Sequence, residues 1–159
     1  SNVPLGNEVD SLLYLEYHAT LAVMAVLDVP PMPVDGHRAF GSGPISWIAD
    51  NQQKGVSATP AMTIHSSVEF AAARLESDPD RWMAELVAAA RPFHEGTVVS
   101  AVAHRWRYAQ PQSTVDVGAV ATVASAPGGV AGDVFAGARV AGASPSGIAA
   151  AQLIMDRLG

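Results

Sequence analysis

The spacing of apolar residues changes along this chain, and that change limits which folds are open to it. Between residues 60 and 68 apolar and polar side chains alternate, as in a strand with one buried face. Between residues 78 and 93 apolar side chains recur at helical spacing, after Asp78 as a helix cap. After residue 97 the side chains alternate between two faces again, as in a strand. This order predicts an α+β fold, with a mostly antiparallel sheet and helices packed on one side.

Two earlier segments also favour strands. Residues 13–28 form a long apolar run that ends at a double proline, and we interpret it as a strand rather than a helix. In residues 41–55, glycine turns enclose a segment in which Ile45, Trp47 and Ala49 would share one face of a strand.

Composition excludes several classes of function. The net charge of -6 argues against binding to nucleic acid or to an anionic membrane surface. The chain has no cysteine, so it has no disulfide and no thiolate site. Its five histidines show no metal-binding spacing, and we expect no metal. The apolar run over residues 19–27 is far shorter than the roughly 20 residues of a membrane-spanning helix, so we expect a cytoplasmic protein without a membrane partner.

The segment "HRWRYAQP" concentrates aromatic and basic residues in a chain that is poor in both. As a strand, it would place His104, Trp106 and Tyr108 on one face and Arg105 and Arg107 on the other. One interpretation is a buried aromatic face with a solvated arginine face. The other is an aromatic platform for a planar ligand, because Trp and Tyr supply flat apolar area with a polar group attached.

The C-terminal region alternates glycines with short apolar segments. We expect a short strand over residues 129–132, a glycine-rich turn that carries an acid, and a helix from about Ser146 to Leu158. Glycines at 132, 137, 142 and 147 would let the backbone approach another group closely. The amides at the start of the helix would suit an electron-rich ligand.

Taken together, "HRWRYAQP" and "AGDVFAGARVAGASPSGIAAA" resemble the C-terminal region of renalase-like FAD-dependent oxidoreductases, in the flavin amine oxidase superfamily. The segments "YHATLAVMAVLD", "WIADNQQKG" and "MTIHSSVEFAAARLESDPDRW" are similar to the substrate domain of that family, in the same order. The resemblance implies a substrate domain whose sheet covers a flavin held by a Rossmann-like domain.

The resemblance also implies roles for particular residues. Asp133 would contact the ribityl or pyrophosphate part of FAD, and the turn from Gly137 to Gly142 would approach the pyrimidine edge of the isoalloxazine ring. The implied cofactor-binding residues are Gly132, Asp133, Gly137, Ala138, Arg139, Val140 and Gly142. The expected substrate cavity is lined by Trp47, His65, His104, Trp106 and Tyr108. No catalytic residue is assigned.

The family begins with a Gly-x-Gly-x-x-Gly element that the first forty residues here do not contain. We therefore expect a tail or cloning scar over residues 1–13, a substrate-domain-like region over 14–126 and an FAD-contacting strand, turn and helix over 127–159. The expected function is that of a fragment or truncated form of an oxidoreductase that takes a hydride from a small reduced substrate onto FAD, and that is not competent alone. The alternative is a non-catalytic domain that has lost FAD and binds a small molecule or dimerises. We expect a homodimer under either hypothesis.

Overall fold

The chain is divided into two units. The computed structural model describes residues 12, 14–31, 36–115, 117–121 and 128–159. The first unit, His18–Ala109, is called the sheet unit here, and residues up to Tyr17 together with Gln110–Gly159 form the terminal unit. Apart from Leu12, the tail expected over residues 1–13 lies outside the described residues.

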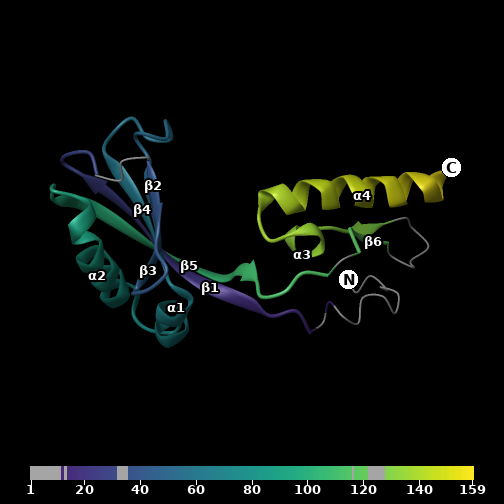
Figure 1. Ribbon diagram of the computed structural model, residues 1–159, viewed down its shortest axis with the longest axis horizontal. Coiled ribbons are helices and arrows are strands. Elements are labelled where there is room, and N and C mark those ends of the chain that lie inside the picture. Colours follow the sequence, from purple (N-terminus) through teal and green to yellow (C-terminus); the bar gives the residue numbers. More distant parts are fainter. Residues whose placement is uncertain (1–11, 13, 32–35, 116, 122–127) are drawn as a thin grey trace. The chain divides into compact units, whose positions relative to one another are not determined.

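The sheet unit is built on a five-stranded sheet with the strand order β2-β3-β4-β1-β5 (Figure 1). The strands are β1 (Tyr17–Leu27), β2 (His37–Ala39), β3 (Ile45–Asp50), β4 (Ala61–Ser66) and β5 (Val98–Pro111). Neighbouring strands from β2 to β1 pair antiparallel. Backbone bonds from Asp28 to Thr97 and from Gln112 to Glu16 join opposite ends of β1 and β5, so this pair is antiparallel too.

Two helices cover one face of this sheet (Figure 1). They are α1 (Val68–Arg74) and α2 (Pro79–Ala90), and α2 continues into the 3₁₀ turn η2 (Arg91–Phe93). Each begins at a residue whose side chain accepts a backbone hydrogen bond, Ser67 from Phe70 and Asp78 from Asp80. Trp82 and Leu86 of α2 are buried in the same core as the sheet. The predicted α+β fold, with an antiparallel sheet and helices on one side, is confirmed.

The faces of β4 follow the sequence pattern, but those of β3 do not. Met62, Ile64 and Ser66 of β4 are buried, as their alternation predicts. In β3 the pairing with β4 shifts between Ile45 and Trp47. The prediction that Ile45 and Trp47 share a face is therefore wrong, because an extra residue in one strand of a pair reverses the faces that follow it.

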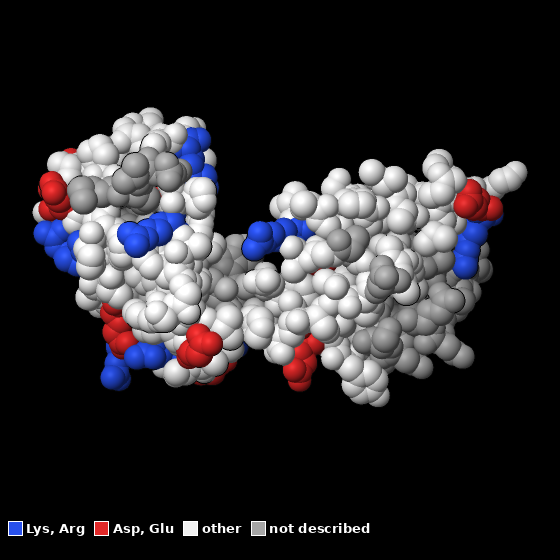
Figure 2. Space-filling model, viewed as in Figure 1, with Lys and Arg blue, Asp and Glu red and all other residues white. Residues whose placement is uncertain are grey.

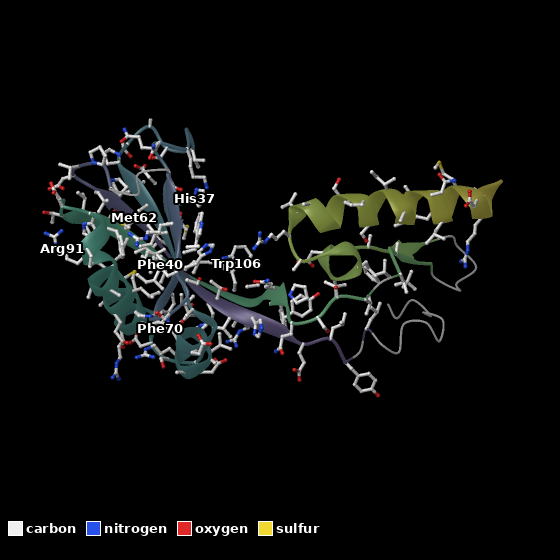
Figure 3. The ribbon with its side chains drawn as sticks, in the orientation of Figure 1. His37, Phe40, Met62, Phe70, Arg91 and Trp106 are labelled. Atoms are coloured by element: carbon white, nitrogen blue, oxygen red, sulfur yellow. The ribbon has the colours of Figure 1, made fainter. Side chains whose placement is uncertain are left out.

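The faces of β5 correct the interpretation of its aromatic residues as core. Ala101 and Ala103 pack against the core, so Trp106 points to the other face, where it is 52% exposed. Arg105 lies on the helix side, where its guanidinium donates to the Ser77 carbonyl at 2.9 Å. In Figure 3, Trp106 lies on the side of the sheet away from α2, whereas Met62 lies on the side of that helix. The arginine face is thus the one that meets the helices.

The terminal unit has a smaller core of its own. Its elements are β6 (Val120–Ala121), β7 (Gly129–Val130), α3 (Asp133–Ala136) and α4 (Val140–Leu158), and β6 pairs antiparallel with β7. The core consists of Val120, Val134 and Phe135, with partly buried neighbours. The expected helix start at Ser146 is wrong, because α4 begins six residues earlier and contains Pro145 within it. Ser146 is buried and its hydroxyl bridges the Gly118 carbonyl and the Gly132 amide.

On the side shown in Figure 2, acidic and basic residues are scattered among a majority of uncharged ones. In the described part of the chain, no helix has the length and apolar character needed to cross a bilayer.

Candidate functional site

The side of the sheet opposite α1 and α2, called the helix-free face here, carries the unusual side chains of this chain. Trp47 on β3 pairs directly with His65 on β4, and His65 pairs with Ala22 on β1. Directly paired residues point to the same side of a sheet. His104 and Trp106 lie on this side of β5, since their neighbours Ala101 and Ala103 face the core.

Trp47 is the centre of one ring cluster on this face. Its ring centroid lies 5.1 Å from that of His65 and 6.4 Å from that of His37. The ammonium of Lys54 lies 5.1 Å from the Trp47 ring centroid, within the range of a cation–π contact. The ring of Trp47 therefore already has a cationic partner, Lys54.

The environment of His65 favours a neutral imidazole. Burial lowers the pKa of His65, and the positive charge of Lys54 lowers it further. In the pairing register His65 lies between Trp47 on β3 and Ala22 on β1, and its ring contacts that of Trp47. A neutral imidazole has one nitrogen that donates and one that accepts a hydrogen bond, so His65 can offer either to a polar ligand.

The second ring cluster lies on β5. His104 and Trp106 meet edge to face, with ring centroids 4.4 Å apart. Tyr108 follows on the same side of the strand and is 79% exposed. Trp106 is exposed as well, so the two rings offer flat apolar area with polar groups attached to a ligand on this face.

The five residues expected to line a substrate cavity thus belong to one face, in two ring clusters separated by β1. Ala22 lies between the clusters in the register and is only 3% exposed. Two cavities lined by described residues include none of these five side chains. One lies between α1 and α2 and the other beside Phe40 and Phe93.

The residues expected to contact FAD lie in the terminal unit. Gly132 precedes α3, Asp133 is its first residue, and the turn Gly137 to Arg139 connects it to α4, which begins at Val140. Ala138 lies within that turn. Arg139 has a φ of 127°, a region that residues other than glycine rarely adopt. A strained turn before a helix is typical of functional loops.

Other features of the terminal unit bear on the residues expected to contact FAD. A Cβ at Gly142 would lie 1.8 Å from the Gly137 carbonyl oxygen, so the fold itself requires this glycine. Positions 132 and 137 have no atom within 4 Å of such a Cβ, and Gly137 has a φ of 121°. Burial, and after it the negative charge of Asp133, raises the pKa of Tyr17.

Sequence reasoning missed the pocket between α1 and α2. Its lining includes Arg74 and Glu85, which lie on different helices and make an ion pair at 2.7 Å. No motif connects two residues at this separation, and only the packing of α1 beside α2 brings them together. Among the described residues, no group of three or more His, Asp or Glu could hold a metal ion.

Comparisons with known proteins leave the family open. No family model matches the chain, and no curated protein matches it. The resemblance to renalase-like oxidoreductases stays an expectation from the residues quoted in the sequence analysis.

Proposed function

We propose that the helix-free face binds a planar ring and that the chain forms the substrate-side part of a flavin-dependent oxidoreductase. The observation that carries the proposal is the exposure of Trp106 beside His104, on the face that also carries Trp47 and His65. Stacked and edge-to-face ring contacts contribute about 0.5–1.5 kcal/mol each beyond the area that they bury. A planar cofactor or substrate would gain several such contacts.

When bound, FAD would supply the chemistry by accepting a hydride from a small reduced substrate. The residues of this chain would orient the rings and exclude water. Trp106 and Trp47 offer flat apolar surface, and His65, as a neutral imidazole, offers a hydrogen bond without adding a charge. No residue of the face is assigned to a proton-transfer step.

The terminal unit has groups that suit the polar parts of a flavin cofactor. Gly132 and Gly137 leave open space where a side chain would stand, so a ligand can approach the backbone there. The side chain of Arg139 makes no capping hydrogen bond at the start of α4. The backbone amides of the first turn of a helix are suited to an anionic or electron-rich group. Asp133 supplies a carboxylate for ribityl hydroxyls.

Replacement of Trp106 by alanine tests the proposal. We expect Trp106→Ala to weaken FAD binding by about fivefold, because the loss of a ring contact costs about 1 kcal/mol. Trp106→Phe should retain most of the affinity. Quenching of flavin fluorescence on titration with the full chain measures the effect. Val99→Ala, an exposed substitution on the same strand, is the matched control and should leave binding unchanged.

The result also separates the alternative function. A wild-type chain that does not quench flavin fluorescence would contradict flavin binding by the helix-free face of this chain. If it sediments as a dimer that Trp106→Ala converts to monomer, the aromatic face is an interface between two copies. This outcome would favour the dimerisation domain, and it would also account for the homodimer that we expect from the sequence.

A further inference from the structure

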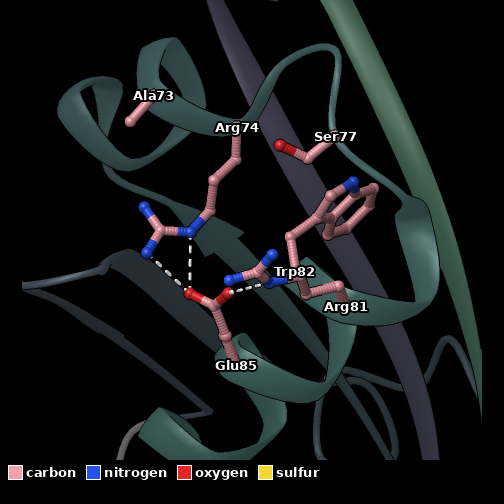
Figure 4. A pocket seen from close by; sticks show the side chains of 6 residues that line it. All are labelled: Ala73, Arg74, Ser77, Arg81, Trp82 and Glu85. Atoms are coloured by element: carbon pink, nitrogen blue, oxygen red, sulfur yellow. Dashed lines mark hydrogen bonds and ion pairs between the residues drawn. The ribbon is translucent and has the colours of Figure 1, made fainter.

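The pocket between α1 and α2 has a polar lining unlike that of the surrounding core (Figure 4). Its volume is about 280 Å³, close to the lower end of the range for small-molecule sites. The lining residues are Ala73, Arg74, Ser77, Arg81, Trp82 and Glu85. It opens on the helix side of the sheet and includes none of the aromatic residues of the helix-free face.

The two arginines of the pocket are held differently. Arg74 donates from both Nε and Nη2 to the same oxygen of Glu85, each at 2.7 Å, so the charge of Glu85 is largely satisfied. Arg81 reaches the other oxygen of Glu85 only at 3.7 Å, and its side chain is 82% exposed. The lining thus carries two positive charges and one negative charge, and the guanidinium of Arg81 retains donors for a ligand.

The indole of Trp82 supplies a second, independent observation. Trp82 is 1% exposed, and its Nε1 has no hydrogen-bond acceptor among the described residues. A buried donor without a partner costs about 1–3 kcal/mol, so such groups are rare and need an explanation. In Figure 4 the nitrogen edge of the indole lies on the side toward Ser77. An oxygen placed between these two residues would satisfy the donor.

Arg105 of β5 adds a further positive charge at the connection between α1 and α2. Arg105 of β5 donates from Nη2 to the Ser77 carbonyl, and its buried Nε also has no acceptor among the described residues. The connection holds two carboxylates, one on each side of Ser77. Glu76 is paired with Arg107, whose hydrogen bond lowers the pKa of Glu76, and Asp78 accepts from the Asp80 amide. The surroundings of Ser77 therefore hold unsatisfied donors while both neighbouring acids already have partners.

We propose that this pocket binds a small acid through its oxyanion, a phosphate or a carboxylate group. Arg81 would pair with the charge, and Trp82 Nε1 and the Ser77 hydroxyl would donate to its oxygens. Because Trp82 Nε1 is closed to solvent, the ligand oxygen reaches it only when a side chain at the mouth moves. Arg81 is suited to this movement because it is exposed and only loosely held. The site is independent of the flavin proposal.

The test uses the full chain labelled with ¹⁵N and follows the three indole N–H signals by NMR. Trp47→Phe and Trp106→Phe each remove one signal, which assigns the remaining one to Trp82. Sodium phosphate and sodium acetate are titrated separately at fixed pH, with sodium chloride at matched ionic strength as the reference. We expect a saturable downfield shift of the Trp82 indole proton with at least one of the two oxyanions and none with chloride.

Two variants that each remove one positive charge decide whether the site is the pocket. Arg81→Gln should weaken binding by about tenfold, because a hydrogen bond to a charged group contributes at least about 1.4 kcal/mol. Arg38→Gln, outside the pocket, should leave binding unchanged. A response to phosphate alone identifies a phosphate site, and a response to acetate identifies a carboxylate site. No saturable shift, or equal weakening in both variants, overturns the proposal.

Discussion

At the scale of single residues, His65 gives the stability of the fold a dependence on pH. Burial and Lys54 hold the pKa of His65 below its ordinary value, so near and below pH 6.5 the unfolded chain binds more protons than the folded one. The free energy of unfolding should therefore be highest above about pH 6.5 and fall as the pH is lowered toward the folded pKa. Urea unfolding across this range checks the direction. His65→Gln should flatten the dependence, and a slope that is unchanged in the variant would rule out His65 as its source.

At the scale of elements, the start of α2 is fixed by one side chain. Asp78 accepts a hydrogen bond from the Asp80 amide at 2.9 Å, one residue before Pro79 begins the helix. Asp78→Ala should lower the free energy of unfolding by about 1 kcal/mol, because the amide loses its acceptor. Asp78→Asn keeps a capping oxygen and should retain most of the stability. Urea denaturation of the three proteins measures both effects, and equal losses in the two variants would exclude capping as the cause.

The elements also show how far the sequence predicts this fold. The alternation in β4 and the Asp78-Pro79 signal of α2 are local, so they predict those elements and their buried residues. The faces of β3 and β5 depend on pairing with other strands. In β3 a register shift places Trp47 on the opposite face from Ile45. In β5 the alternation separates the residues into two faces, but it does not determine which face packs against the helices.

The two candidate sites also differ in how far the sequence predicts them. The sequence singles out Trp106 because aromatic side chains are scarce in the chain, and His65 because it lies in the middle of a predicted strand. It gives no sign of the pocket between α1 and α2, because Arg74 and Glu85 become partners only when two helices pack side by side. Residues that only tertiary packing brings together show no characteristic spacing in the sequence, so sequence analysis does not find such a site.

At the scale of the whole molecule, the two units have separate cores. The core of the sheet unit includes Leu86, whereas that of the terminal unit is formed around Phe135, and none of the described residues belongs to both. Leu86→Ala should lower the free energy of unfolding of the sheet unit by about 2–5 kcal/mol, because it leaves a cavity beneath α2. Hydrogen exchange measured by mass spectrometry should then accelerate in peptides from β3, β4 and α2 while those from α4 change less. Equal acceleration throughout would mean that the two cores unfold as one cooperative unit, coupled through β1 and β5, whose ends at Tyr17 and at Gln110 and Pro111 belong to the terminal unit.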